Sequence, residues 1–337
     1  MFLGCCNPDR CSLLKSLSMN KSTLFFGIDI SKDCFDVYSD QMGYNSYSNT
    51  KDGFKIFLKV LGKTSHCVME ATGCYHHKLA MFLYEKGIAI SVINPLIIKR
   101  FIQMKLRRVK TDKSDAFMIY NYAYEQSLKQ WEPEVVYIVK AKELLSLIQT
   151  YLRQATALKN KLHALENRGH SKGIMMTSIK RQLRQLKKEH KLLEKELETL
   201  IKSNEPNLFS RLNTIPGIGK KTAVLMMVST SNFNSFNSYK QVSSYLGLAP
   251  NERSSGSSIR GKSRISKTGD GLLRNHLFMC SFTASVHNPQ CKALFDRIVA
   301  KGKSKKLALI AVCNKLIKQA FAIAKSGLPY DSNYAVK

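Results

Sequence analysis

The chain has 337 residues, 44% of them hydrophobic, which is enough for two or three domains with sizeable cores. It carries 53 Lys and Arg residues against 24 Asp and Glu, a net charge of +29, which favours nucleic acid as partner because bound phosphates release counterions. Charge alone leaves open a membrane surface, or a merely soluble basic protein such as a ribosome-associated one. We expect no membrane span, because no run approaches about 20 apolar residues.

The first segment, residues 1–18, differs in composition from the rest, and we interpret it as a leader or as sequence upstream of a start at Met19. It lacks the apolar run of a secretory signal. The cysteines are odd in number and spaced irregularly without a CxxC pair, so a zinc site has little support, and a reducing cytoplasm fits best. The nine are Cys5, Cys6, Cys11, Cys34, Cys67, Cys74, Cys280, Cys291 and Cys313.

From Leu24 to about Gln126, short apolar segments alternate with segments of helical spacing, which predicts an α/β sheet. The predicted strands are residues 24–30, with 34–39 as their hairpin partner, 66–70 and 88–93. The predicted helices are residues 52–61, residues 77–85 and a helix that begins at Pro95.

Residues 138–203 have apolar residues at alternating steps of three and four, which predicts two long helices with coiled-coil spacing. A turn at residues 167–173, with two glycines, joins them. Either this arm pairs with a second subunit, or its two helices pack against each other within one chain; the spacing favours neither. We interpret His190, on the apolar seam, as a packed residue rather than a ligand.

The third region, from about residue 207 to 325, is predicted to be helical at both ends, with a Gly-, Ser- and Arg-rich loop at 253–271 that orders on its partner. Residues 212–221 have the pattern of a helix-hairpin-helix turn. There Gly217 and Gly219 would let backbone N–H groups approach a phosphate, and Lys220 and Lys221 would add attraction. The alternative is an ordinary turn between helices.

Four acidic residues stand where an α/β sheet gathers ligands. Asp29 ends the first predicted strand, Glu70 ends a later one, and Asp112 and Asp115 share a face at the start of an apolar helix. Converging carboxylates repel one another unless a cation neutralises them, and oxygen ligands suit Mg²⁺. Two such ions about 4 Å apart can hold both oxygens of a phosphodiester exchange. Singly, Asp112 could cap its helix and Asp29 could be one strand-end acid among many, but the joint pattern favours catalysis.

These motifs resemble those of the DEDD transposases of the one-ten insertion-sequence family, relatives of the Piv invertase. The matching stretches are FGIDISK (26–32), EATG (70–73), NP (94–95) and KTDKSDA (110–116), and the resemblance covers roughly residues 24–327. It implies an RNase-H-like domain similar to the RuvC Holliday-junction resolvase. It also implies that the four acids bind Mg²⁺ as the catalytic tetrad: Asp29, Glu70, Asp112 and Asp115.

A serine in the basic loop extends the resemblance. From chemistry alone, a hydroxyl beside a glycine among cations could reach a phosphorus, although such loops are usually linkers. The family's catalytic serine sits in a Ser-Gly step, which corresponds to Ser255 here, and the adjacent Ser254 remains the rival. The residues predicted to contact nucleic acid are Arg107, Arg108, Lys110, Gly217, Gly219, Lys220, Lys221, Arg253, Arg260, Lys262, Arg264 and Lys267.

The resemblance implies a mechanism and partners. A serine hydroxyl attacks a DNA phosphate, a covalent 5′-phosphoserine link forms, and strands are exchanged between donor and target DNA by a homodimer or homotetramer. In the family, the RuvC-like domain of one subunit and the serine domain of another share each active site. Some members also use a noncoding bridge RNA that pairs with both DNAs; whether this chain does so stays open.

The predicted organisation is α/β plus α. It comprises a leader (1–18), a RuvC-like DEDD domain (19–130), a coiled-coil helical arm (138–203), a helical serine transposase domain with a helix-hairpin-helix-like turn (207–327) and a tail (328–337). The predicted function is site-specific transposition or inversion, at the nucleoid of a prokaryotic cell. Two rivals stay open: a hydrolytic RuvC-like junction nuclease that uses the acids without Ser255, and a non-enzymatic nucleic-acid-binding protein.

Overall fold

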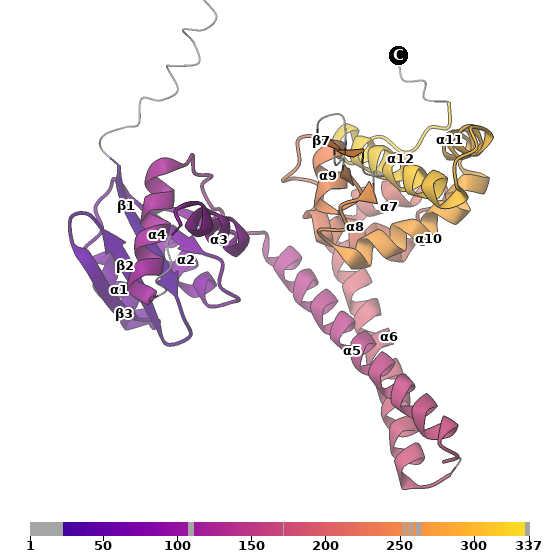
Figure 1. Cartoon of the computed structure of the whole chain (residues 1–337), viewed down its shortest axis with the longest axis horizontal. Helices are drawn as coiled ribbons and strands as arrows, with labels where there is room; N and C mark the ends of the chain where they lie inside the picture. Colours follow the sequence, from indigo (N-terminus) through magenta and orange to yellow (C-terminus); the bar gives the residue numbers. More distant parts are fainter. Residues whose placement is uncertain are drawn as a thin grey trace, which may run out of the picture. The chain divides into compact units, whose positions relative to one another are not determined.

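The computed structural model describes residues 23–106, 111–170, 172–251, 254–255, 259–260 and 264–333. They fall into two compact units, unit 1 up to Pro133 and unit 2 from Glu134 onward, each with its own hydrophobic core (Figure 1). The predicted leader, residues 1–18, lies outside the described residues. The six cysteines within them are free thiols.

Unit 1 is built on a five-stranded sheet with the strand order β3-β2-β1-β4-β5. An antiparallel meander is formed by β1 (Leu24–Ile30), β2 (Cys34–Ser39) and β3 (Gly43–Ser48), and both β4 (Ser65–Glu70) and β5 (Ala89–Ile93) run parallel to β1. The carboxyl ends of β1, β4 and β5 therefore lie at one edge of the sheet, where open α/β sheets bind ligands.

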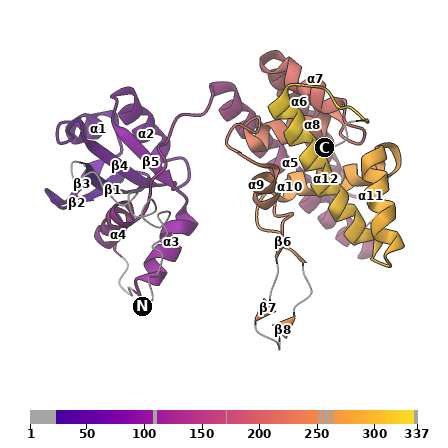
Figure 2. The same cartoon turned by 90° about the horizontal axis from the view of Figure 1, so that it is seen from above.

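Helices cover both faces of this sheet, because its central strands bear apolar residues on both sides (Figure 2). On one face, Phe26 and Ile28 of β1 share a core with α1 (Lys51–Leu58) and α2 (His76–Glu85). On the other face, Val68 of β4 packs with α3 (Pro95–Met104) and α4 (Asp112–Glu125). This is the mixed α/β architecture that the sequence predicts, and it is consistent with an RNase-H-like domain.

One strand was missed by the sequence analysis. β3 has the sequence GYNSYS, whose Asn, Ser and Gly residues are typical of a turn as much as of a strand. Pairing with β2 along its whole length makes it the edge strand of the sheet. The helix expected at residues 52–61 ends earlier, at Leu58.

Unit 2 begins with a helical hairpin, here called the arm, formed by α5 (Val136–Asn167) and α6 (Ile174–Asn204), which lie side by side (Figure 1). Of the two alternatives for the arm, packing of its two helices within one chain is therefore present. Pairing of the arm with a second subunit stays a prediction. His190 is packed as expected, with its side chain 17% exposed and its Nδ1 3.4 Å from an oxygen of Glu194.

The base of the arm enters the core of unit 2. Leu145 and Ile148 of α5 and Leu197 and Ile201 of α6 are buried with residues of the helices that follow. Those helices are α7 (Pro206–Asn213), α8 (Lys220–Thr230), α9 (Tyr239–Tyr245), α10 (Gly271–His287), α11 (Pro289–Ala300) and α12 (Lys305–Ser326).

The expectation of no membrane span bears on helix α12. Among the described helices it alone is long and apolar enough to cross a bilayer, with a mean hydropathy of 1.6 in its most apolar window. Half of that window is buried within unit 2, where α12 packs against α10 and α11. These contacts make α12 a core helix of unit 2.

Candidate active site and nucleic-acid contacts

Two of the predicted acids lie at the ends of neighbouring parallel strands. Asp29 is the penultimate residue of β1, and Glu70 is the last residue of β4. The register places Ile28 beside Met69, so Asp29 and Glu70 follow at the same level of the sheet. Because alternate residues share a face and Val68 packs under α3 and α4, both acids belong to the face that these helices cover.

Helix α4, which carries the other two acids, lies directly on this face. A Cβ atom at Gly27 of β1 would lie 2.2 Å from the backbone nitrogen of Tyr120 and 2.4 Å from the carbonyl oxygen of Ala116. Only glycine therefore lets the α4 backbone come this close to β1. Asp115 directly precedes Ala116, and Asp29 lies two residues beyond Gly27, so this contact brings strand-borne and helix-borne acids into one region of unit 1.

The first turn of α4 is capped by Thr111. Its hydroxyl accepts a hydrogen bond from the backbone N–H of Ser114, and the Ser114 hydroxyl accepts one from the N–H of Thr111, which forms a capping box. Asp112 is therefore the first residue of the helix, and its interpretation as the cap is wrong. Asp115 follows three residues later on the same helix face.

The donor set fits a hard divalent cation, since all four predicted ligands offer carboxylate oxygens and none offers nitrogen or sulfur. The side chain of Asp112 lies outside the described part of the structure. Among the side chains that are described, no group of three or more His, Cys, Asp or Glu residues is arranged to hold a metal ion. Joint metal coordination by the four acids stays a prediction.

A fifth acid beside Asp29 was missed by the sequence analysis. The antiparallel register puts Asp36 of β2 directly opposite Asp29 of β1. Asp36 is 6% exposed and accepts a 2.6 Å hydrogen bond from the hydroxyl of Tyr44 on β3. Facing residues in such a pair have Cβ atoms about 4.5–5.5 Å apart, so Asp36 belongs to the immediate surroundings of Asp29. Counting outward from the predicted hairpin turn would have found it.

The loops that follow the two acid-bearing strands are tied together by Asn49. Its side-chain amide donates to the backbone carbonyl of Ser31 at 2.9 Å and to that of Tyr75 at 3.5 Å. Ser31 lies two residues after Asp29, and Tyr75 lies five residues after Glu70. Asn49 thus fixes the spacing of the chain segments on either side of the predicted site.

The predicted nucleophile lies on a short β-ribbon of unit 2. Ser254 and Ser255 form β7, which pairs with β8, Ile259 and Arg260. The register places Arg260 opposite Ser254 and Ile259 opposite Ser255. The side chains of these residues lie outside the described part of the structure, so the choice between the two serines stays a prediction.

The base of this ribbon is anchored to the helices of unit 2. β6 (Pro250–Asn251), labelled in Figure 2, pairs with β9 (Arg264–Ile265). Arg274 of α10 donates to the carbonyl of Leu246 at 2.9 Å. A Cβ atom at Gly269 would lie 1.9 Å from the carbonyl oxygen of Tyr245, so glycine permits the crossing of these segments. Part of the predicted loop at 253–271 is therefore paired strand.

The predicted helix-hairpin-helix turn connects α7 with α8. Gly217 has a φ of +103°, and a Cβ atom there would lie 2.7 Å from that of Ala284 on α10. Close packing within unit 2 thus requires this glycine irrespective of any phosphate. Gly219 and Lys220, by contrast, are exposed at the start of α8, and no atom lies within 4 Å of a Cβ built at Gly219.

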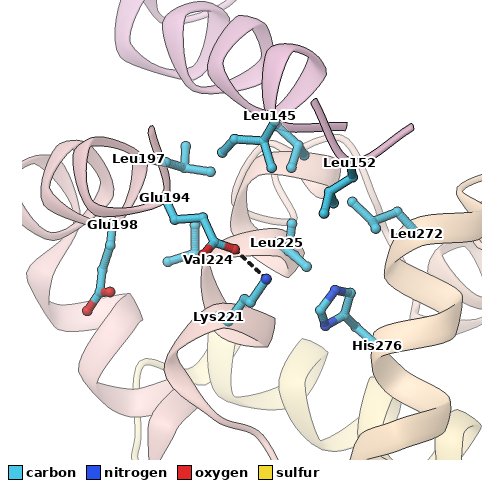
Figure 3. A pocket seen from close by; sticks show the side chains of 11 residues that line it. Leu145, Leu152, Glu194, Leu197, Glu198, Lys221, Val224, Leu225, Leu272 and His276 are labelled. Carbon is cyan, nitrogen blue, oxygen red and sulfur yellow. Dashed lines mark ion pairs between the residues drawn. The ribbon is translucent and has the colours of Figure 1, made fainter. Parts of the chain in front are cut away.

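Lys221 is engaged within unit 2, where it forms an ion pair with Glu194 of α6 (Figure 3). The pair lines a pocket of about 110 Å³ between α5, α6, α8 and α10, and His276 lines the same pocket beside Lys221. Burial lowers the pKa of His276, and the charge of Lys221 lowers it further, while Glu194 and Asp270 oppose the shift.

The structure describes only some of the other residues that the sequence predicts to contact nucleic acid. Arg264 and Lys267 are exposed near the base of the serine ribbon. Only the backbone of Arg260 is described. Outside the described residues lie Arg107, Arg108, Lys110, Arg253 and Lys262.

Two family models and several curated relatives match this chain. A family model for DEDD transposases of IS110 elements matches residues 26–167, and the model described as the transposase IS116/IS110/IS902 family matches residues 209–296. The chain is 31% identical over 323 residues to the pilin gene-inverting protein of Moraxella bovis, covering 92% of this chain and 98% of that protein. It is 27% identical over 331 residues to the transposase for insertion sequence element IS1111A of Coxiella burnetii, covering 88% of each. With the two family models matching in chain order and a relative that aligns along nearly its whole length, the chain belongs to the IS110 family of transposases, enzymes that cut and rejoin DNA.

Proposed function

We propose that this chain exchanges DNA strands with the carboxylates of unit 1 and the hydroxyl of Ser255 in unit 2. The observation that carries the proposal is the common location of the acids: Asp29 and Glu70 end adjacent parallel strands, and α4, which begins at Asp112, is packed onto the same face of the sheet. The four carboxylates would hold Mg²⁺, which supplies positive charge to polarise a phosphate and to stabilise the transition state.

Ser255 would act as the nucleophile. Its Oγ attacks a backbone phosphorus, the bond from phosphorus to the 3′ oxygen breaks, and the serine proton passes to that leaving oxygen through solvent. The products are a 5′-phosphoserine and a free 3′-hydroxyl. Attack by a 3′-hydroxyl of the second DNA on the phosphoserine reverses these changes and joins new strands. Each phosphodiester bond is conserved, so the exchange needs no external energy source.

The substrate would be double-stranded DNA in which an element is moved or inverted. Both outcomes are represented among the relatives, one named for pilin gene inversion and another for an insertion sequence. The exposed cations Lys220, Arg264 and Lys267 would contact phosphates without reading sequence. A homodimer or homotetramer would hold donor and target DNA. The net charge of +29 would also favour binding of a noncoding bridge RNA.

Recombination in cells tests the two-part chemistry. The gene is kept beside its native flanking DNA, and junctions between element ends and target are sequenced for the wild type, Asp29→Ala and Ser255→Ala. Joined products from the wild type and none from either variant are expected. Joined products from Ser255→Ala would mean that another residue is the nucleophile, with Ser254 the next candidate, or that the carboxylates act alone by hydrolysis.

Asp115→Asn separates metal chemistry from binding. The amide keeps the size of the side chain but removes its charge, so we expect strand cleavage to fall by at least about 100-fold. Binding of labelled duplex DNA, measured by fluorescence anisotropy, should stay within about twofold of the wild type. Cleavage at the wild-type rate would remove Asp115 from the proposed site.

The RNA partner is tested separately. The tagged full chain is purified from cells that carry its native flanking DNA, and the bound RNA is sequenced. Enrichment of a transcript from the flanking DNA over bulk cellular RNA supports a bridge RNA. Recombination that persists when that flanking region is not transcribed argues against one.

A further inference from the structure

The arm is divided into two halves of different charge. From Arg153 to Lys188, a segment here called the distal arm, Glu166 is the one acidic residue and ten residues are basic. All ten are exposed. They are Arg153, Lys159, Lys161, Arg168, Lys172, Lys180, Arg181, Arg184, Lys187 and Lys188.

Several cations near the base of the arm form ion pairs with acids, whereas the described cations of the distal arm form none. Near the base, Lys140 lies 3.1 Å from Glu196 and Lys202 lies 2.6 Å from Glu198. Within the described residues of the distal arm, no Lys or Arg forms an ion pair with an acidic side chain. A cationic surface left without counter-charges repels itself, and an external polyanion relieves that repulsion.

Cations from both helices converge on one side of the distal arm. Lys159 of α5 and Arg184 and Lys187 of α6 line one groove of about 390 Å³ between the helices. Along α6, Lys180, Arg184 and Lys187 follow one another at steps of four and three, which places them on one helix face. The distal half of α5 is about 22 Å long at 1.5 Å per residue, a length that spans several phosphates of a nucleic-acid strand.

We propose that the distal arm binds the phosphodiester backbone of nucleic acid, independently of base sequence. Its exposed guanidinium and ammonium groups match phosphate oxygens, and its length allows several simultaneous contacts. Two copies of so cationic a surface would repel each other, which disfavours the distal arm as the contact between subunits. The surface lies in a different region of unit 2 from the serine ribbon, so it adds a nucleic-acid contact to those predicted from the sequence motifs.

Charge removal in the full chain tests this surface against a matched control. The arm variant replaces four cations of α6 by Gln: Arg181, Arg184, Lys187 and Lys188. The control variant replaces four exposed cations of unit 1 by Gln: Lys59, Lys63, Lys78 and Lys86. Fluorescence anisotropy measures the affinity for duplex DNA, duplex RNA and single-stranded DNA of about 30 nucleotides, at several salt concentrations.

For its preferred nucleic acid, the arm variant should bind at least about tenfold more weakly near physiological salt. On duplex DNA, the slope of log affinity against log salt concentration should become shallower by up to about 3.6. This is about 0.9 for each of four lost phosphate contacts. The control should change much less, and circular dichroism should show both variants folded. Equal losses in the two variants, or an unchanged arm variant, would overturn the proposal. The probe that loses most affinity identifies whether DNA or RNA lies on the arm.

A second inference rests on separate contacts in unit 1 and on the proposed metal site there. Asp36, opposite Asp29, accepts the hydrogen bond of the Tyr44 hydroxyl. The ammonium of Lys113 lies 5.8 Å from the centre of the Tyr44 ring, and Lys113 stands between Asp112 and Asp115 in the first turn of α4. Tyr44 therefore connects the strand region around Asp29 to the helix turn that carries the other two acids.

The geometry points to Tyr44 as a positioning residue that sets the first turn of α4 relative to β1 and β2. Its hydroxyl fixes the ring against Asp36, and the ring attracts Lys113 through its π-face. Losing the hydroxyl frees the ring, so the acids of α4 should be held less firmly. Residues that orient metal ligands in this way typically change metal affinity about 10- to 100-fold when they are replaced.

Tyr44→Phe is compared with Tyr84→Phe, an exposed tyrosine in the last turn of α2, beside β5 at the opposite edge of the sheet from β3. The readout is thermal stabilisation of the full chain by Mg²⁺ and Mn²⁺, alongside the metal dependence of strand cleavage. Tyr44→Phe should raise the midpoint metal concentration at least about tenfold in both assays while keeping the cleavage rate at saturating metal. Equal midpoints in Tyr44→Phe and the wild type would refute the positioning role. Asp29→Ala should abolish stabilisation by metal; a wild type that shows none would refute the metal site itself.

Discussion

Because Gly27 has no side chain, α4, which carries two of the predicted acids, packs very closely against β1, which carries Asp29. The backbone of α4 occupies the space that a Cβ would take, within 2.2 Å of Tyr120 and 2.4 Å of Ala116. Asp29 and Asp115 are each within two residues of this contact. The close contact at Gly27 therefore also sets where two of the proposed metal ligands lie relative to each other.

Gly27→Ala should destabilise unit 1 by at least about 1–3 kcal/mol, because the added methyl group forces α4 away from β1. Urea denaturation followed by far-ultraviolet circular dichroism measures this loss. Gly62→Ala is the matched control, since no atom lies within 4 Å of a Cβ built at Gly62. Equal denaturation midpoints for the two variants would contradict the close packing inferred at Gly27.

At the scale of elements, α6 has two different environments along one helix. Near its C-terminus Leu197 and Ile201 are buried in the core of unit 2, whereas in the distal arm Leu183 and Leu186 are only partly buried, beside exposed basic residues. Regular leucine spacing runs through both parts. The same periodicity thus serves packing in the core of unit 2 at one end and packing of α6 against α5, beneath exposed cations, at the other.

Ile201→Ala should therefore cost about 2–5 kcal/mol of unfolding free energy, as is usual for a fully buried aliphatic residue, and Leu186→Ala much less. Urea denaturation of the two variants gives the comparison, because both changes lie on one helix and leave the charge unchanged. A larger loss for Leu186→Ala would mean that the distal arm, rather than its base, carries the packing energy of the hairpin.

The elements that sequence periodicity predicted are those whose own residues bury apolar surface. The strands at β1, β2, β4 and β5 and both arm helices belong to this group. β3 escaped prediction because its pairing with β2, rather than its polar composition, makes it a strand. Asp36 was not predicted as part of the site, because only the strand register places it opposite Asp29, and no sequence motif includes it. The sequence left open whether Asp112 caps α4, and the structure shows that Thr111, one residue earlier, is the cap.

At the scale of the whole molecule, two compact units with separate cores predict two unfolding events. Each unit contains a half-buried histidine whose pKa burial lowers below the ordinary 6.5: His66 in unit 1, with its Nε2 2.9 Å from the hydroxyl of Ser91, and His276 in unit 2. A histidine with a lowered pKa binds its proton more readily when unfolded. Each unit should therefore lose stability as the pH falls through 6.5.

Differential scanning calorimetry of the full chain between about pH 7.5 and about pH 5.5 tests this separation. The wild type should show two transitions that both move to lower temperature on acidification. In His66→Gln one of them should become less sensitive to acid, and in His276→Gln the other, because each substitution removes a proton-binding group that favours unfolding of its own unit. In unit 1 part of the sensitivity should remain, because burial also lowers the pKa of His76. One transition affected equally by both substitutions would show that the two cores unfold as a single cooperative body.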